Sequence, residues 1–186
     1  MNLFVNAISR NAKLILFDDN KNIIQQVDFE IKWNESSLLL PKIDQFLKSN
    51  NLSYNDIKNI AVVNWPGSFT WARTIVLVIN TIAFLTNCNI TPLNYFDLFN
   101  SYPIIKSSSK RDSFFKNTHN SDIIIIENNK LEELLKKKQI ESIFWEWDIK
   151  NIKIIEKIDY YNIIKWIKLK DFKQISPLYI KKPNIS

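Results

Sequence analysis

The chain has 186 residues, 46% of them hydrophobic and 13% aromatic, which excludes a disordered protein and suits one sizeable domain or two small ones. Its longest nearly uncharged run, residues 74–87, is shorter than the roughly 18–20 residues that span a bilayer, and no secretory signal opens the chain. We therefore expect a cytoplasmic protein without membrane contact. Cys88 is the only cysteine, which excludes an internal disulfide or a thiolate metal cluster and favours a small buried side chain over a reactive thiol.

The net charge of +6 comes entirely from the second half of the chain. Residues 1–100 carry 8 basic and 8 acidic side chains, whereas residues 101–186 carry 17 and 11. This excess suggests either a surface that contacts RNA or a solvated lysine-rich face. Ile, Asn and Lys make up 76 of the 186 residues, as in the products of AT-rich genes, and this favours the solvated face.

The first part of the chain predicts a small mixed sheet with helices. Three apolar runs predict strands joined by tight turns: residues 2–8, 13–18 and 22–29. A helix is predicted over residues 36–49, with its apolar side chains on one face. The polar connector that follows gives Asp56 the setting of a turn residue rather than a catalytic base.

The segment Asn64–Arg73 is the clearest motif of the chain. A short apolar run before it predicts a buried strand, and Pro66–Gly67 predicts a tight turn. A helix over residues 70–86 follows, with Ser68 or Thr70 as its N-cap. Such a strand, turn and capped helix is a common α/β junction that leaves free backbone N–H groups at the start of the helix.

This motif resembles the G-P-G-S-F-T-G-x-R signature of the TsaB (YeaZ) family of bacterial tRNA-modification proteins. The residues that match the signature are Pro66, Gly67, Ser68, Phe69, Thr70 and Arg73. Trp65 and Trp71 stand where the family has glycine. Two further segments, residues 35–44 and 177–181, are similar to the family's S-E-x-L-L-P-x-I-D and P-x-Y-[LI]-[RK] patterns. The resemblance implies an α/β, actin-like (RNase H-type) ATPase-superfamily fold of two small lobes.

We expect the lobe boundary near residue 100. Residues 1–100 then form the actin-like lobe with the signature loop, and residues 101–186 form a smaller, basic α/β lobe. In the second lobe we expect a hairpin, a buried strand over residues 123–126, an exposed helix over 128–139 and a helix over 159–167. The family has a D-A-R-like turn in this hairpin, whereas this sequence has Lys106, Ser107 and Ser108 instead, so no function of the family's aspartate carries over.

The helix at 70–86 is apolar on almost every side, so one sheet cannot cover it. The remaining surface needs a second domain, another helix or another subunit. In the TsaB family this helix and the preceding one form a subunit interface. We therefore predict a partner or self-dimer interface at Leu39, Ile43, Phe46, Ile75, Val76, Ile79, Ile82 and Ala83.

The resemblance implies a non-catalytic scaffold, or pseudo-enzyme, for the modification of adenosine 37 in tRNA. Its expected partners are the catalytic subunit TsaD and the ATPase TsaE, with tRNA contacted through the complex. In active actin-like proteins the first strand ends in an acidic residue near the nucleotide phosphate or metal, but here Asn6 takes that place, and an amide lacks the anionic oxygen that magnesium favours. We expect neither a cofactor nor a metal.

Two alternatives come from other classes of protein. One is an actin-like ATPase or a peptidase-type enzyme, against which stand Asn6 and a single histidine, His119, outside any G-x-S-x-G setting. The other is a basic RNA-binding module, which the neutral first half disfavours. Titration of the isolated chain with nucleotide separates the scaffold from the ATPase.

One glycine and six tryptophans are an unusual composition for a globular protein. Trp65, Trp71, Trp145 and Trp147 stand where the family has glycine. We hypothesise that the gene uses UGA as a glycine codon, as some AT-rich bacterial lineages do, and that the native protein has glycine there and at Trp33 and Trp166. If tryptophan is native, Trp65 and Trp71 are expected to project outward or crowd the loop, and to occlude any anion site at the helix start. The alternative is a set of genuine tryptophans that form an aromatic binding surface.

Overall fold

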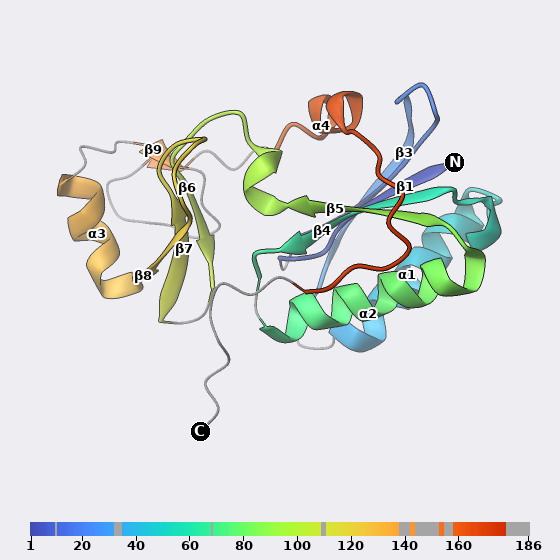
Figure 1. Cartoon of the computed structure of the whole chain (residues 1–186), viewed down its shortest axis with the longest axis horizontal. Helices are drawn as coiled ribbons and strands as arrows, with labels where there is room; N and C mark the ends of the chain where they lie inside the picture. Colours follow the sequence, from blue (N-terminus) through green and yellow to red (C-terminus); the bar gives the residue numbers. More distant parts are fainter. Residues whose placement is uncertain are drawn as a thin grey trace.

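The first lobe is built on a five-stranded mixed sheet (Figure 1). The computed structural model describes residues 1–9, 11–31, 35–67, 69–108, 111–137, 142–143, 153–154 and 158–177. The strands are β1 (Asn2–Asn6), β2 (Asn11–Phe17), β3 (Ile23–Glu30), β4 (Asn59–Trp65) and β5 (Asn89–Asn94), in the order β3-β2-β1-β4-β5. The first three form an antiparallel meander, and β4 and β5 run parallel to β1. The strands predicted at the start of the chain are confirmed.

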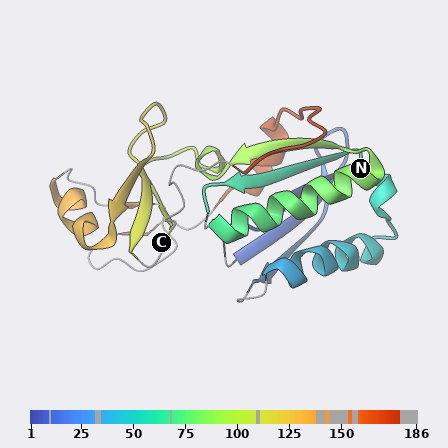
Figure 2. The same cartoon turned by 60° about the horizontal axis from the view of Figure 1, so that its bottom comes forward.

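Two helices, α1 (Glu35–Ser49) and α2 (Phe69–Thr86), cover one face of this sheet (Figures 1 and 2). Buried apolar residues recur every three or four positions along each helix, so each helix packs one continuous side against the sheet. Ile43 and Ile79 are fully buried in this layer, as are Ile60 and Val62 of β4. Each such side chain contributes about 1.5–3 kcal/mol relative to an exposed position. Both predicted helices and their common side of the sheet are confirmed.

The opposite face is covered by α4 (Tyr160–Trp166) (Figure 1). The ring of Tyr160 meets Phe4 of β1 edge to face, with 5.7 Å between centroids, and Ile164 is fully buried. The sheet therefore lies between two helical layers.

After α4 the chain runs beside β5 and on to α2. The Ile90 N–H donates to the Phe172 carbonyl at 2.7 Å, and the Asn80 amide exchanges two hydrogen bonds with the backbone of Ile175, at 2.8 and 3.0 Å. The predicted boundary near residue 100 assigned residues 158–177 to the second lobe, whereas these contacts join them to the first.

The second lobe has its own three-stranded antiparallel sheet, in the order β6-β7-β8. Its elements are β6 (Ile104–Ser107), β7 (Asp112–Lys116), β8 (Ile124–Glu127), α3 (Asn128–Lys137) and the short parallel pair β9 (Ser142–Ile143) and β10 (Lys153–Ile154). The hairpin is confirmed. The strand predicted to be buried is β8, but Ile124 is 46% exposed and Ile125 36%, so that burial is not found.

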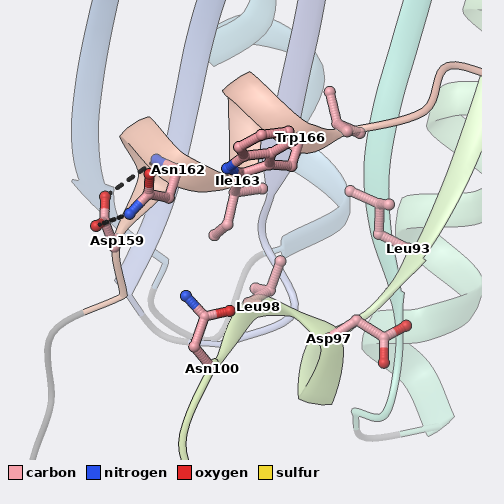
Figure 3. Close-up of a pocket in the computed structure, with 9 residues that line it drawn as sticks. Leu93, Asp97, Leu98, Asn100, Asp159, Asn162, Ile163 and Trp166 are labelled. Carbon is pink, nitrogen blue, oxygen red and sulfur yellow. Dashed lines mark hydrogen bonds between the residues drawn. The ribbon is translucent and has the colours of Figure 1, made fainter.

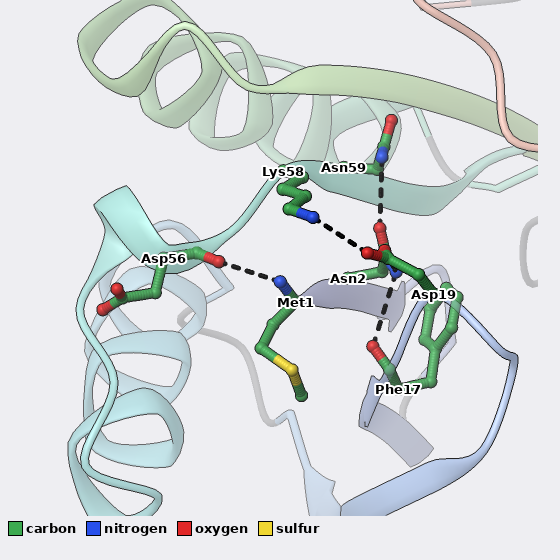
Figure 4. A network of polar contacts seen from close by, with 7 residues as sticks. All are labelled: Met1, Asn2, Phe17, Asp19, Asp56, Lys58 and Asn59. Carbon is green, nitrogen blue, oxygen red and sulfur yellow. Dashed lines mark hydrogen bonds and ion pairs between the residues drawn. The ribbon is translucent and has the colours of Figure 1, made fainter.

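The end of the first sheet that lies away from the second lobe is held by polar contacts (Figure 4). The side chains of Asn2 and Asn59 are bonded to each other at 3.1 Å, and Asn2 also donates to Asp19 at 3.1 Å. Lys58 forms an ion pair with Asp19 at 2.8 Å, and these bonds from Lys58 and Asn2 lower the pKa of the Asp19 carboxyl. The network joins β1, the β2–β3 turn and β4.

The turn role predicted for Asp56 is confirmed. Its carboxylate accepts hydrogen bonds from the backbone N–H and the hydroxyl of Ser53, both at 2.8 Å, which lowers its pKa. Across the described part of the chain, no helix has the length and apolar character to cross a membrane.

Candidate functional site

The signature loop lies where the two lobes meet, between β4 and α2. Trp65 is 9% exposed, and its ring packs between Phe96 of the first lobe and Phe114 of the second, at centroid distances of 6.4 and 6.5 Å. Of the two alternatives predicted for Trp65, outward projection is excluded, and crowding of the loop stays a prediction. Aromatic pairs at such distances contribute about 0.5–1.5 kcal/mol beyond their burial, so Trp65 helps to connect the lobes.

The rest of the loop is only partly described. Pro66 is buried, Trp71 is half-buried against the core, and Thr70 and Arg73 are exposed on the first turns of α2. Ser68 and the side chain of Phe69 lie outside the described part of the chain, so their predicted roles stay predictions.

Gly67 marks a close approach between the loop and the turn after β1. A Cβ atom at this position would lie 2.6 Å from both Cγ1 and Cδ1 of Ile8, closer than non-bonded carbons approach. A larger residue at position 67 would therefore require the Ile8 side chain to shift, whereas the backbone conformation does not itself demand glycine, since its φ is not positive. The matched glycine of the signature thus has a packing role.

Asn6 ends β1 at this junction, where active actin-like proteins are expected to have a carboxylate. It is 2% exposed, and its Nδ2 donates to the hydroxyl of Tyr160 at 3.0 Å. Its Oδ1 is buried without a hydrogen-bond partner among the described residues. Burial raises the pKa of Tyr160 to about 12, although the bond from Asn6 lowers it, so the phenol is neutral at ordinary pH.

The second lobe contributes Lys106 of β6 to the same junction. Its side chain is 2% exposed, its Nζ donates to the hydroxyl of Ser9, and the charge lies 4.7 Å from the ring centroid of Tyr95. A buried ammonium needs such partners. Lys106 therefore joins β6 to the turn after β1 and to the segment after β5.

The residues predicted for the partner interface are buried inside the chain. All eight are at most 6% exposed, because they form the chain's own core between the helices and the sheet: Leu39, Ile43, Phe46, Ile75, Val76, Ile79, Ile82 and Ala83. They have almost no surface to offer a partner. The prediction is corrected accordingly.

The exposed apolar side chains of these helices are different ones. On α2, Leu77 is 68% exposed, Phe84 86% and Leu85 73%, and on α1 Leu40 is 42% exposed. We call Leu77, Phe84 and Leu85 the outer face of α2. Sequence reasoning missed it because the helix is apolar nearly all round, so periodicity did not separate its inner from its outer side.

The described side chains that could act as nucleophiles or metal ligands do not come together in one site. Cys88 is buried as predicted, and burial raises the pKa of its thiol. His119 is exposed and lies 3.2 Å from the hydroxyl of Tyr102, measured from Nδ1. Among the described residues, no three His, Cys, Asp or Glu side chains gather as metal ligands would.

A cavity of about 330 Å³ lies between α4 and the end of β5 (Figure 3). Its lining residues are Leu93, Asp97, Leu98, Asn100, Asp159, Asn162, Ile163, Trp166 and Ile167. Asp159 caps α4, accepting from the backbone N–H of Asn162 at 3.1 Å and from its Nδ2 at 2.6 Å. This cavity was not predictable from local sequence patterns, because its lining residues come from two segments about sixty positions apart.

The strand order and the two helical layers define an actin-like (RNase H-type) fold, as predicted. Two solved structures from Pseudomonas aeruginosa support this assignment. One is described as a protein with similarity to the peptidase YeaZ, with a TM-score of 0.56, 12% identity, and coverage of 68% of this chain and 67% of that one. The other is YeaZ, with a TM-score of 0.53, 12% identity, and coverage of 68% and 65%. These likenesses concern the fold alone.

Two curated relatives match almost the whole chain. The uncharacterized protein MG208 homolog of Mycoplasma pneumoniae is 24% identical over 189 residues, which is 97% of this chain and 95% of the relative. The uncharacterized protein MG208 of Mycoplasma genitalium is 23% identical over 188 residues, with the same coverage. No protein-family model matches the chain.

Proposed function

We propose that this chain is a TsaB-like, non-catalytic scaffold subunit of the cytoplasmic machinery that modifies adenosine 37 of tRNA. The observation that carries the proposal is the outer face of α2, an apolar surface on a fold that resembles YeaZ. Contiguous exposed apolar side chains are typical of protein–protein interfaces. The proposed partner is the catalytic subunit TsaD, with the ATPase TsaE joining the complex.

The lobe junction supports a role without catalysis. Asn6 offers a buried amide where the fold's enzymes use a carboxylate, and Lys106 and Tyr95 from two segments fill the space beside Ser9. The competing proposal is an actin-like ATPase or a peptidase-type enzyme. Calorimetric titration with ATP and magnesium separates the scaffold from the ATPase, since an ATPase must bind its nucleotide and the scaffold need not.

The docking proposal is tested by co-purification of the cognate TsaD with wild-type chain and with Phe84→Asp and Leu85→Asp. Each variant places an unpaired carboxylate in the interface, so affinity is expected to fall at least about tenfold. Ile24→Asp is the matched control, because Ile24 is a 55% exposed apolar residue on β3, away from α2.

Two results would contradict the docking proposal. One is a TsaD affinity equal in all four proteins, and the other is no TsaD binding by the wild-type chain. A second copy of this chain is the competing occupant of the same face. Light scattering with the same variants reveals it as a dimer that Phe84→Asp converts to monomer.

A further inference from the structure

The segment that runs from α4 to the pairing of Phe172 with β5 carries interspersed basic and aromatic side chains on the first lobe. We call this the basic–aromatic face, made of Tyr161, Lys165, Trp166, Lys168, Lys170 and Phe172. All six are exposed, with Tyr161 at 64%, Trp166 at 73% and Phe172 at 48%. Large aromatic rings at such exposure are unusual on a surface that has no partner.

Cations and rings lie beside one another on this face. The Lys165 ammonium is 5.5 Å from the ring centroid of Trp166, and the Lys170 ammonium is 5.9 Å from that of Phe172. Two carboxylates lie near these lysines in the sequence: Asp159 is hydrogen-bonded to Asn162 in the cap of α4, and the exposed Asp171 stands between Lys170 and Phe172. A nucleotide pairs an anionic phosphate with a flat base in the same way, and single-stranded nucleic acids are bound by stacking on aromatic rings beside cationic groups.

The cavity described above opens beside Trp166, so the face includes a pocket (Figure 3). Its apolar side chains, among them Leu93 and Ile163, suit the flat faces of a base. Asp97 and Asn100 on the segment after β5 supply acceptor and amide groups for the edge of a base. About 330 Å³ lies within the usual range of small-ligand pockets.

We propose that the basic–aromatic face of the chain as written, with tryptophan at position 166, binds single-stranded RNA, with an unpaired base stacked on Trp166 and directed into this cavity. The choice of RNA rests on the proposed role in tRNA modification, whereas the rings, lysines and cavity stand independently of it. A cavity of this size beside an exposed ring suits a single flat base, which a single-stranded nucleic acid supplies and an anionic membrane surface does not.

Fluorescence anisotropy of a labelled ten-nucleotide RNA, titrated with the full chain at several salt concentrations, tests the inference. Trp166→Ala is expected to weaken binding about tenfold, the usual scale for loss of one stacked base, and Trp166→Phe is expected to restore most of it. The double variant Lys165→Ala/Lys168→Ala removes two phosphate contacts. It is expected to reduce the slope of log affinity against log salt by about 1.4.

Two controls separate this face from general basic charge and from the other helical layer. Lys136→Ala/Lys137→Ala removes two exposed lysines of α3, and Phe84→Ala removes an exposed ring of α2. Neither is expected to change RNA affinity more than about twofold, because single-site effects of uninvolved surface residues are small. An equal loss in the α3 variant would assign binding to diffuse charge and overturn the inference.

Other outcomes are equally decisive. No RNA binding at low salt, or binding unaffected by Trp166→Ala, overturns the site. Equal affinity for single-stranded DNA of the same sequence overturns the assignment to RNA, and Trp166-dependent binding to anionic vesicles assigns the face to membranes instead. TsaD co-purification is measured in parallel with the same variants. RNA binding without TsaD binding overturns only the proposed scaffold role, and the reverse result overturns only this inference.

Discussion

At the scale of single residues, buried polar side chains at the junction between the lobes join segments that are far apart in the sequence. Asn6 binds the Tyr160 hydroxyl, and Lys106 binds the Ser9 hydroxyl. Each buried polar group therefore fixes one segment against another, since an unpaired partner would cost about 1–3 kcal/mol. The amide at position 6 was visible in the sequence. The hydroxyl of Tyr160, 154 positions away, was not, because only the return of α4 to the first sheet brings it there.

The raised pKa of Tyr160 predicts a loss of stability at alkaline pH. Burial lifts it from 10.0 to about 12, so the folded state holds the phenolic proton more tightly than the unfolded state. The resulting stabilisation is complete below about pH 10 and disappears as pH rises towards 12, by an amount on the order of 2–3 kcal/mol. Urea unfolding of wild type and Tyr160→Phe at intervals from pH 8 to 12 measures it.

The difference between the two proteins isolates Tyr160, since Tyr54 and Tyr102, whose pKa values are also raised by burial, are present in both. Wild type is expected to lose more unfolding free energy across this window than Tyr160→Phe. Curves that stay parallel from pH 8 to 12 would contradict the buried, hydrogen-bonded phenol.

At the scale of secondary structure, the sequence predicted most of the first lobe. The strand runs, the tight turn at Pro66–Gly67 and the apolar helix over residues 70–86 are local patterns, and local patterns fix element type. The side of α2 that faces the core was not predictable, because nearly every position of that helix is apolar. The docking of residues 158–177 on the first lobe was also missed, since it depends on pairing between segments about eighty positions apart.

The Asn80 side chain is predicted to hold the segment after α4 against α2. It donates to the Ile175 carbonyl at 2.8 Å and accepts from the Ile175 N–H at 3.0 Å. Asn80→Leu removes both bonds and leaves two backbone groups without partners, so it is expected to cost about 1–3 kcal/mol. Hydrogen exchange at the Ile175 amide should accelerate more than exchange in β1. Unchanged protection at Ile175 would show that other contacts hold the segment.

At the scale of the whole molecule, none of the described tryptophans has the positive φ angle that favours glycine. The positive φ angles of the described residues belong to Lys21, Asn51 and Asn87, and none belongs to a tryptophan. Trp65 fills a place between the rings of Phe96 and Phe114 that joins the lobes. Trp33, Trp145 and Trp147 lie outside the described residues.

The hypothesis of UGA as a glycine codon predicts glycine in the native protein at positions 33, 65, 71, 145, 147 and 166. Intact-mass measurement of the protein from its own host decides it, because each exchange of tryptophan for glycine removes a fixed and resolvable mass.

The packing of Trp65 also predicts how much stability this exchange would cost. In the chain as written, Trp65→Gly should lower the free energy of unfolding by on the order of 3–5 kcal/mol, as other large core truncations do. A small loss would show that the junction holds without the ring. The RNA site requires tryptophan at position 166, so a native mass equal to that of the written chain ends the codon hypothesis and preserves the stacking surface, whereas glycine at 166 removes that surface.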